Sequence, residues 1–214
     1  VAARLFELDK IVTEKVNAYD FHAVFTELHD FCNSDLSAFY FDIRKDMLYC
    51  DALDSKPRRA ALTMMDRCFK SLVAWIAPIL CFTADEAWLA YTGNSEDSIH
   101  LHEYQKMPKE WQNASLIQKW EQVRSIRSQV TTALESARSV SKIGGSLQAS
   151  VMLSLPEAEA KLLSDMDLPA LFITSDVQII DDNAEQLGVE INLAEGSKCA
   201  RCWKILPEVA TNED

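Results

Sequence analysis

The stretch Ser34–Tyr49, which reads SDLSAFYFDIRKDMLY, indicates the fold class because its apolar residues recur at helical spacing. Those residues are Leu36, Phe39, Tyr40, Ile43 and Met47. Ser34 is placed to cap this helix, and Asp35 lies in its first turn, where the helix dipole favours an acid. Phe41 and Leu48 widen the apolar surface beyond what packing against a single neighbour requires. We therefore expect a helix inside a bundle, contacted from several sides.

Helical periodicity also marks the segments on either side of this stretch. The spacing predicts helices over Ala2–Tyr19, from a cap at Asp20 to Cys32, over Arg58–Ala77 and over Leu116–Val140. Pro78 ends the third of these because proline removes a helical donor. A short strand is expected at Ile99–Leu101, where His100 and His102 alternate without a further metal ligand nearby.

The pattern changes after Gly144 and Gly145, which break the last long helix. Alternating apolar residues predict a half-buried strand over 147–155, and Pro156 begins a short helix to about Met166. Two further strands are predicted, at 171–174 with a possible continuation to 180, and at 189–193. A long helix that leads into a few short strands and a helix predicts a small α/β appendage.

The composition of the chain limits the classes of function that it can have. Its 214 residues are 48% apolar, which suffices for a sizeable core. No apolar run is long enough for a membrane span and no leader peptide is recognisable, so we expect a cytoplasmic protein without a membrane partner. The net charge of -12 means that nucleic-acid binding would need a local basic patch. The scattered cysteines suit reduced thiols in a cytoplasmic protein. Six are present: Cys32, Cys50, Cys68, Cys81, Cys199 and Cys202.

The last cysteine pair lies in the segment Lys198–Trp203, KCARCW, and its spacing lets both sulfurs reach one metal ion from a tight turn. Cys199 and Cys202 would be half of a tetrahedral zinc site. No cysteine or histidine follows before Asp214, so we expect an incomplete site. The alternatives are a redox dithiol, for which the usual strand-then-helix context is missing, and two unrelated thiols.

Four stretches resemble one protein family. Ser34–Tyr49 is similar to a signature in the anticodon-binding domain of bacterial isoleucyl-tRNA synthetases, within the close group of isoleucyl, valyl and leucyl enzymes. Residues 77–88, APILCFTADEAW, resemble another segment of that domain, and residues 137–151, ARSVSKIGGSLQASV, resemble the linker after its last long helix. Residues 199–203 resemble the first half of the C-terminal zinc knuckle of the same enzymes, a knuckle related to that of formamidopyrimidine-type DNA glycosylases.

The resemblance implies a mainly α fold, with the anticodon-binding helical bundle of a class I aminoacyl-tRNA synthetase followed by a small α/β appendage. We expect a bundle over 1–115 with a truncated first helix, a long helix and α/β subdomain over 116–196, and an incomplete zinc knuckle over 197–214. The chain would be a C-terminal fragment of a monomeric isoleucine-tRNA ligase. It would recognise the anticodon of tRNA(Ile) and bind no DNA.

The resemblance also implies where the cofactors belong. In the intact protein Cys199 and Cys202 would bind zinc, whereas ATP and Mg would belong to a missing catalytic domain that attaches isoleucine to tRNA(Ile). No catalytic constellation is found in the sequence, so this chain is expected to be inactive by itself.

Anticodon recognition needs cations for phosphates and flat surfaces for splayed bases. Candidate tRNA contacts are Arg44, Lys45, Arg58, Arg59, Lys142, Arg201 and Trp203. Packing of Trp203 against the α/β appendage is the alternative interpretation of that residue.

Three other identities are possible. A valyl-type synthetase domain is disfavoured by the 144–147 linker and the cysteine pair. A non-catalytic helical interaction protein would fit the composition, and it predicts no effect of anticodon sequence on binding. A DNA-repair module would explain the half knuckle but leaves the acidic bundle without a role.

Overall fold

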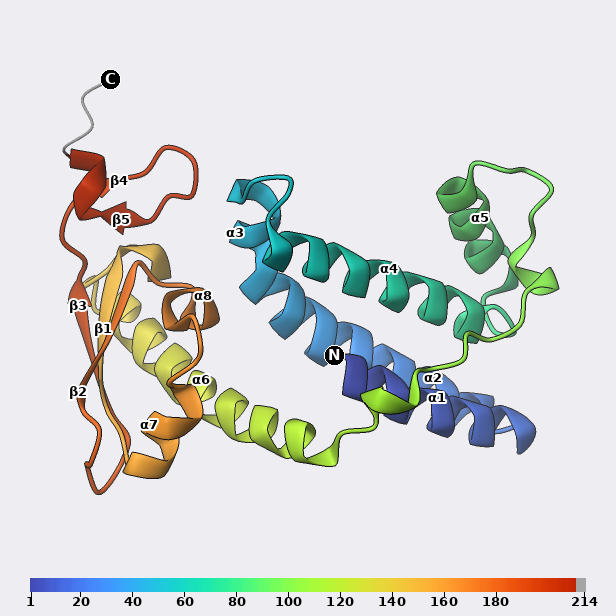
Figure 1. The fold of residues 1–214 in the computed structure, drawn as a ribbon, viewed down its shortest axis with the longest axis horizontal. Coiled ribbons are helices and arrows are strands. Elements are labelled where there is room, and N and C mark those ends of the chain that lie inside the picture. Colours follow the sequence, from blue (N-terminus) through green and yellow to red (C-terminus); the bar gives the residue numbers. More distant parts are fainter. Residues whose placement is uncertain (211–214) are drawn as a thin grey trace. The chain divides into compact units, whose positions relative to one another are not determined.

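The computed structural model describes residues 1–210, which fall into two compact units (Figure 1). The first unit spans Val1–Ile117 and the second begins at Gln118, so the division falls inside one long helix. The last four positions of the predicted 197–214 segment lie outside the described residues. Each unit is described by itself below.

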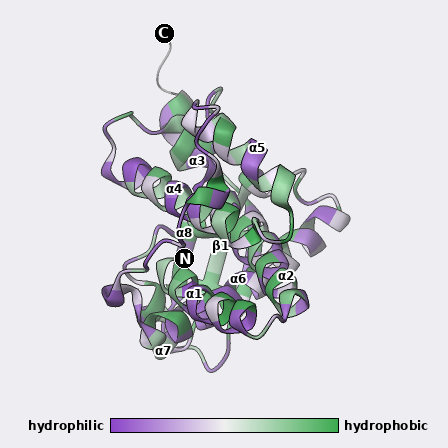
Figure 2. Ribbon diagram, turned by 90° about the vertical axis from the view of Figure 1, so that its right-hand side faces the viewer, coloured by the Kyte–Doolittle hydropathy of each residue, from purple (hydrophilic) through white to green (hydrophobic). Residues whose placement is uncertain are grey.

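The first unit is helical, as the sequence predicts. Its elements are α1 (Ala2–Asn17), α2 (Phe21–Asp30), the π-helix η1 (Phe31–Phe41), α3 (Asp42–Cys50), α4 (Lys56–Ile76), α5 (Cys81–Thr92) and the 3₁₀ turns η2 (Ile99–Leu101) and η3 (Lys109–Trp111). Figure 2 shows hydrophilic and hydrophobic residues alternating along α1, α2 and α4, as expected of helices with one buried face. The predicted bundle is therefore confirmed.

Two groups of buried side chains hold this unit together. The larger group joins α1, α2, η1 and α4 around Trp75, which is 1% exposed, and Phe31, which is fully buried. The smaller group joins α4, α5 and η2 around Trp88 and Ile99. Helix α4 begins two residues before the predicted Arg58, at Lys56 with Ser55 as its N-cap, and it ends at Ile76, shortly before Pro78 as predicted.

The helix of the 34–49 stretch does not begin at Ser34, so that prediction is wrong. Phe31 has helical backbone angles, φ -61° and ψ -47°, and α2, η1 and α3 follow one another without a break. The buried residues explain this, because Phe31 and Leu36 are five residues apart and the i→i+5 bonding of a π-helix accommodates that spacing. Asp35 serves another purpose than expected, since its carboxylate lies 3.4 Å from the Arg4 guanidinium of α1.

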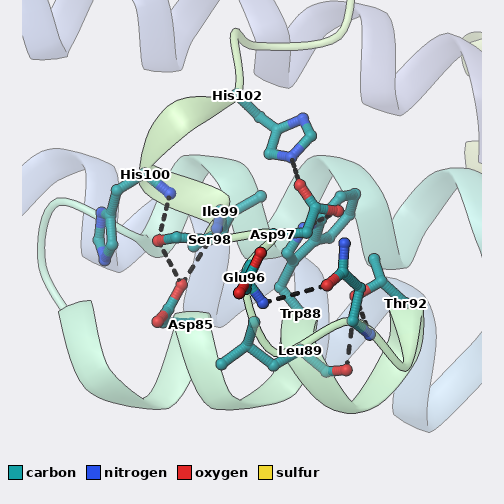
Figure 3. A network of polar contacts seen from close by, with 11 residues as sticks. Asp85, Trp88, Leu89, Thr92, Glu96, Asp97, Ser98, Ile99, His100 and His102 are labelled. Carbon is teal, nitrogen blue, oxygen red and sulfur yellow. Dashed lines mark hydrogen bonds and ion pairs between the residues drawn. The ribbon is translucent and has the colours of Figure 1, made fainter.

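The strand predicted at Ile99–Leu101 is also wrong, since these residues form the 3₁₀ turn η2. A carboxylate of α5 determines this conformation (Figure 3). Asp85 Oδ1 accepts hydrogen bonds from Ser98 Oγ at 2.6 Å and from the Ile99 backbone amide at 3.0 Å. The Ser98 hydroxyl then accepts from the backbone amide of His100, which caps the turn.

Both histidines of this segment have hydrogen-bond partners, and that of His102 is a second carboxylate in the same network (Figure 3). Asp97 bonds to Nε2 of His102 at 2.6 Å and accepts from Nε1 of Trp88 at 3.3 Å. His100 Nε2 lies 3.2 Å from the backbone oxygen of Cys81, in the first turn of α5. These contacts attach the 94–102 loop to α5, and no metal is needed to account for either imidazole.

The second unit combines helices with two small sheets. Its elements are α6 (Ala114–Ser139), η4 (Ser146–Gln148), β1 (Ala149–Ser154), α7 (Glu157–Leu163), α8 (Leu168–Phe172), β2 (Asp176–Asp181), β3 (Gly188–Leu193), β4 (Ser197–Lys198), β5 (Ile205–Leu206) and η5 (Pro207–Ala210). The larger sheet has the order β2-β1-β3, with β1 parallel to β2 and antiparallel to β3. Figure 1 shows α6 along one face of this sheet. The predicted α/β appendage is thus confirmed.

Within this unit, the strand predicted at 171–174 is wrong, because most of that segment belongs to α8 or its cap. The Asp167 side chain accepts the Ala170 backbone amide at 3.1 Å, and Pro169 lies in the first turn, where its fixed φ suits a helix. Ile173 ends the helix with φ 59°, and the strand begins only at Asp176.

Within residues 1–210, no helix is both long and apolar enough to span a membrane.

Candidate functional site

Four of the predicted RNA contacts lie at one end of the helical unit. Arg44 and Lys45 belong to α3, Arg58 and Arg59 lie in the first turn of α4, and α3 packs against α4 (Figure 1). Residues 42–59 contain five lysines or arginines and four aspartates, in a chain with 33 acids and 21 bases. This end of the unit therefore holds slightly more bases than acids within an acidic chain, and we call it the cationic end.

The two cations of α3 differ in their surroundings. Lys45 is exposed, and its ammonium lies 4.0 Å from Asp42 Oδ1 in an ion pair that solvent screens strongly. Arg44 is half-buried beside Tyr40. Burial raises the pKa of the Tyr40 hydroxyl, and the Arg44 charge opposes that rise. Lys45 is the better placed of the two to meet a phosphate.

The two arginines of α4 differ in the same way. Arg58 Nη1 donates to the backbone oxygen of Asp51 at 3.3 Å, and its Nε is buried without a hydrogen-bond partner. Ser55 Oγ donates to the Asp51 carboxylate at 2.9 Å and accepts the Arg58 backbone amide at 3.5 Å. Arg58 thus braces the loop between α3 and α4, whereas Arg59 is exposed. RNA contact by either arginine stays a prediction.

Two aromatic side chains at this end were not among the predicted contacts. Tyr49, in the last turn of α3, is 78% exposed, and Phe41, at the junction of η1 and α3, is 37% exposed. Phe41 contributes to the packed apolar surface as expected, although about a third of the residue remains exposed. Phe41 and Tyr49 each lie four residues from Lys45, and this helical spacing could have identified both as candidate contacts from the sequence.

The Cys199–Cys202 pair lies in a turn between the short antiparallel strands β4 and β5. The Cys199 backbone amide donates to the Lys204 carbonyl at 2.9 Å, and the Trp203 amide donates to the Cys199 carbonyl at 3.0 Å. Trp203 has φ 65°, a left-handed conformation that costs a residue with a side chain some energy. The tight turn expected from the spacing is present.

This turn is attached to the rest of the second unit. The Ile205 backbone amide donates to Ser175 Oγ at 2.7 Å. Gly196, with φ 120°, lies so close to β5 that a Cβ there would be 2.3 Å from the Leu206 carbonyl. Any side chain at Gly196 would therefore displace β5 and distort the cysteine turn.

The electrostatics of the turn favour a thiolate at Cys199. Hydrogen bonding from the Cys202 and Arg201 backbone lowers the pKa of the Cys199 thiol, with further contributions from the Cys202 side chain and the Trp203 amide. Two thiols on such a turn fit half of a tetrahedral zinc site. Within residues 1–210, no group of three or more histidines, cysteines or acids gathers to complete one.

The remaining predicted contacts belong to the second unit. Trp203 is 61% exposed, and the Lys198 ammonium lies 5.2 Å from the centre of its ring. Arg201, in the same turn, is also exposed. Lys142, three residues after α6 ends, donates from Nζ to Asn192 Oδ1 of β3 at 3.3 Å. Trp203 is thus not packed inside the appendage, although the Lys198 ammonium lies against its ring, and RNA contact by Trp203 stays a prediction.

Comparison with known proteins gives a consistent result. The family described as the anticodon-binding domain of tRNA ligase matches residues 1–153. The isoleucine–tRNA ligase of Gluconobacter oxydans is 44% identical over 213 residues, which cover 99% of this chain and 22% of that protein. Those of Agrobacterium fabrum and Zymomonas mobilis are 43% and 41% identical, and the matches cover 99% and 96% of this chain. The chain spans about a fifth of the length of these curated relatives.

Proposed function

Because the chain belongs to the family of anticodon-binding domains of tRNA ligases, we propose that it recognises the anticodon region of isoleucine-accepting tRNA. The observation that carries this proposal is the family match over residues 1–153, which includes the cationic end formed by α3 and the start of α4. Isoleucine is the proposed amino acid because the relatives, at 40–44% identity, are isoleucine–tRNA ligases.

The charge distribution supports recognition of a local RNA feature over general attraction to nucleic acid. A net charge of -12 repels phosphate at long range, so affinity must come from a few close contacts. Arg59 and Lys45 are exposed cations that can meet phosphates, and Trp203 offers a flat surface for an unpaired base. Each of these kinds of contact, taken within its own unit, suits a splayed loop better than a uniform duplex.

The proposal is tested by the affinity of the chain for isoleucine tRNA and for the same tRNA with a substituted anticodon, at one moderate salt concentration. We expect clearly weaker binding after substitution. Equal binding of both would fit the rival hypothesis of a helical interaction protein that contacts only phosphates. Stronger binding of valine tRNA would instead support a valyl-type domain.

We propose in addition that Cys199 and Cys202 are two of four ligands to a structural zinc ion in the intact protein. The tight turn and the lowered pKa of the Cys199 thiol support this proposal. Bound zinc would supply rigidity to the turn that presents Arg201 and Trp203.

Alkylation followed by mass spectrometry tests the zinc proposal. Zinc added to the chelator-treated intact protein should slow the labelling of Cys199 and Cys202, while exposed Cys32 and Cys81 continue to react. Uniform labelling of all four with and without zinc would contradict it. A Cys199–Cys202 disulfide in freshly isolated protein would support the redox alternative.

The ligase reaction itself is proposed to reside in the parent protein, which we expect to be monomeric and cytoplasmic and to use ATP and Mg²⁺ to attach isoleucine. This chain would position the tRNA and should not charge it alone. An aminoacylation assay with the chain, ATP, isoleucine and tRNA checks this, and any charging above background would contradict it.

A further inference from the structure

One face of α3 presents an aromatic residue, a cation and a second aromatic residue in succession. Phe41, Lys45 and Tyr49 are spaced four residues apart, so their side chains lie along one side of the helix with a rise of about 6 Å per step. Phe41 has helical backbone angles, φ -68° and ψ -37°, so it continues the register of α3. We refer to these three residues as the 41–45–49 face.

The 41–45–49 face is exposed although it carries two large aromatic side chains. Tyr49 is 78% exposed, Phe41 is 37% exposed and Lys45 is also exposed. The buried residue of α3 is Ile43, which faces the interior of the bundle. Much of the Tyr49 side chain and about a third of Phe41 are therefore accessible to a ligand.

The backbone beneath this face is fixed at both ends. The rings of Tyr40 and Phe41 are 6.0 Å apart, and Tyr40 is half-buried against the core. Beyond the last turn of α3, the loop is held by the hydrogen bonds of Asp51 with Ser55 and Arg58. Aromatic rings on a fixed helix lose little conformational entropy when they bind a ligand.

The chemistry of the 41–45–49 face suits single-stranded nucleic acid. A cation between two aromatic rings can hold a phosphate while neighbouring bases stack, and stacking accepts any base because each has a flat face. The contrasting case in the same unit is Phe82 of α5, which is 92% exposed. Residues 80–86 around it include Asp85 and Glu86 but no lysine or arginine, so that ring has no cation beside it in the sequence.

We infer that the 41–45–49 face is a stacking surface for unpaired bases of the tRNA anticodon loop, an inference that rests on the proposed function. Tyr49 stacks on one base, Lys45 neutralises the adjoining phosphate, and Phe41 contacts a second base. The 41–45–49 face strengthens the binding of an unpaired loop, but it does not distinguish one base from another because it makes no hydrogen bonds to base edges.

The test uses the full chain and an anticodon stem-loop RNA of isoleucine tRNA in which a loop base is replaced by the fluorescent analogue 2-aminopurine. Affinity and fluorescence quenching on binding are both measured. We expect Tyr49→Ala to weaken binding about 5- to 150-fold and to reduce quenching, because base stacking on an aromatic residue is lost. Tyr49→Phe keeps the ring face and should stay within about twofold of the unaltered chain.

Two further variants complete the experiment. Lys45→Gln should reduce the slope of log affinity against log salt by about one, as expected for one lost phosphate contact. Phe82→Ala removes an exposed ring without an adjacent cation, and it should leave affinity and quenching unchanged. Circular dichroism of each variant reports whether the helices remain folded.

The outcomes separate this inference from the proposed function. Anticodon-dependent binding that Tyr49→Ala alters no more than Phe82→Ala does would overturn the inference and leave the proposed function standing. Weaker binding of Tyr49→Ala with unchanged quenching would show a structural role and would also overturn it. Binding of the unaltered chain that ignores the anticodon would overturn the proposed function and the inference together.

Discussion

Removing the hydroxyl of Ser55 should destabilise the helical unit and loosen the loop beside its cationic end. Ser55 is the N-cap of α4, and its side chain has two hydrogen bonds. Its Oγ accepts the Arg58 backbone amide at 3.5 Å and donates to Asp51 Oδ2 at 2.9 Å. In a Ser55→Ala variant both are lost, and the Asp51 carboxylate is left without this donor.

The expected cost follows from these two contacts. Replacing an N-cap serine by alanine costs about 0.5–2 kcal/mol, and the long 3.5 Å bond places this cap near the lower end. The hydrogen bond from Ser55 to the Asp51 carboxylate stabilises the fold more than a hydrogen bond between neutral groups would. Because Asp51 is only half-buried, water can replace part of that bond in the variant. The free energy of unfolding should therefore fall by about 1–2 kcal/mol, which lowers the melting temperature of a chain of this size by about 2–8 °C.

Three companion variants make the assay diagnostic. Ser55→Asn keeps both an acceptor for the cap and a donor for Asp51, so it should stay within about 0.5 kcal/mol of the unaltered chain. Ser55→Asp keeps the cap but adds a second carboxylate beside Asp51, and it should be no more stable than Ser55→Ala. Ser95→Ala, on an exposed loop, is the matched control and should change stability by less than about 0.5 kcal/mol.

Urea unfolding of all four variants, followed by tryptophan fluorescence and far-ultraviolet circular dichroism, gives the required free energies. The predicted order of stability is Asn above Ala, with Asp at or below Ala. If Ser55→Ala and Ser55→Asn are equally stable, the hydroxyl does not brace the loop and the reasoning is refuted.

Three other predictions concern residues outside the cationic end. Burial raises the pKa of the Cys68 thiol to about 12, so its alkylation should remain slow up to about pH 9 and become fast only in urea, as mass spectrometry would detect. Asp85→Ala removes the acceptor for two hydrogen bonds from the η2 segment and should cost about 2–4 kcal/mol in urea unfolding, whereas Asp85→Asn retains an acceptor and should cost about half as much. The hydrogen bond from Tyr91 lowers the pKa of Asp66, so Tyr91→Phe should reduce stability at neutral pH, and this difference should fade as the pH falls through the folded-state pKa of Asp66.

Each of these predictions has an outcome that contradicts it. Rapid labelling of native Cys68 at pH 8 would mean that its thiol is accessible. Equal stability of Asp85→Ala and the unaltered chain would remove the proposed cause of the η2 turn. A Tyr91→Phe deficit that grows on acidification would reverse the sign argued for Asp66, because a carboxyl with a lowered pKa stabilises the fold only while it is ionised.

The sequence predicts those elements whose stabilising contacts are close in the chain. Asp20 caps α2 as expected, with its side chain accepting the Ala23 amide at 3.2 Å, and the periodicity of α1, α4 and α6 follows their buried faces. The Asp167-Leu168-Pro169 start of α8 was a readable helix signal, although the apolar residues after it suggested a strand.

The remaining elements depend on contacts that spacing alone does not reveal. The five-residue step from Phe31 to Leu36 is resolved by the π-helix η1, and the η2 turn depends on Asp85, which lies thirteen residues before Ser98. The candidate site, too, could be predicted only in part from the sequence. Cationic residues were identified by type, but exposure of Tyr49 is set by what the bundle leaves uncovered, which periodicity cannot give.

The central claim is that this chain reads the anticodon, and an anticodon transplant tests it most directly. The measurement is the affinity of the full chain for valine tRNA before and after its anticodon is replaced by that of isoleucine tRNA, at one fixed salt concentration. The account predicts that the transplant strengthens binding toward the level of isoleucine tRNA. Unchanged affinity after the transplant would contradict it.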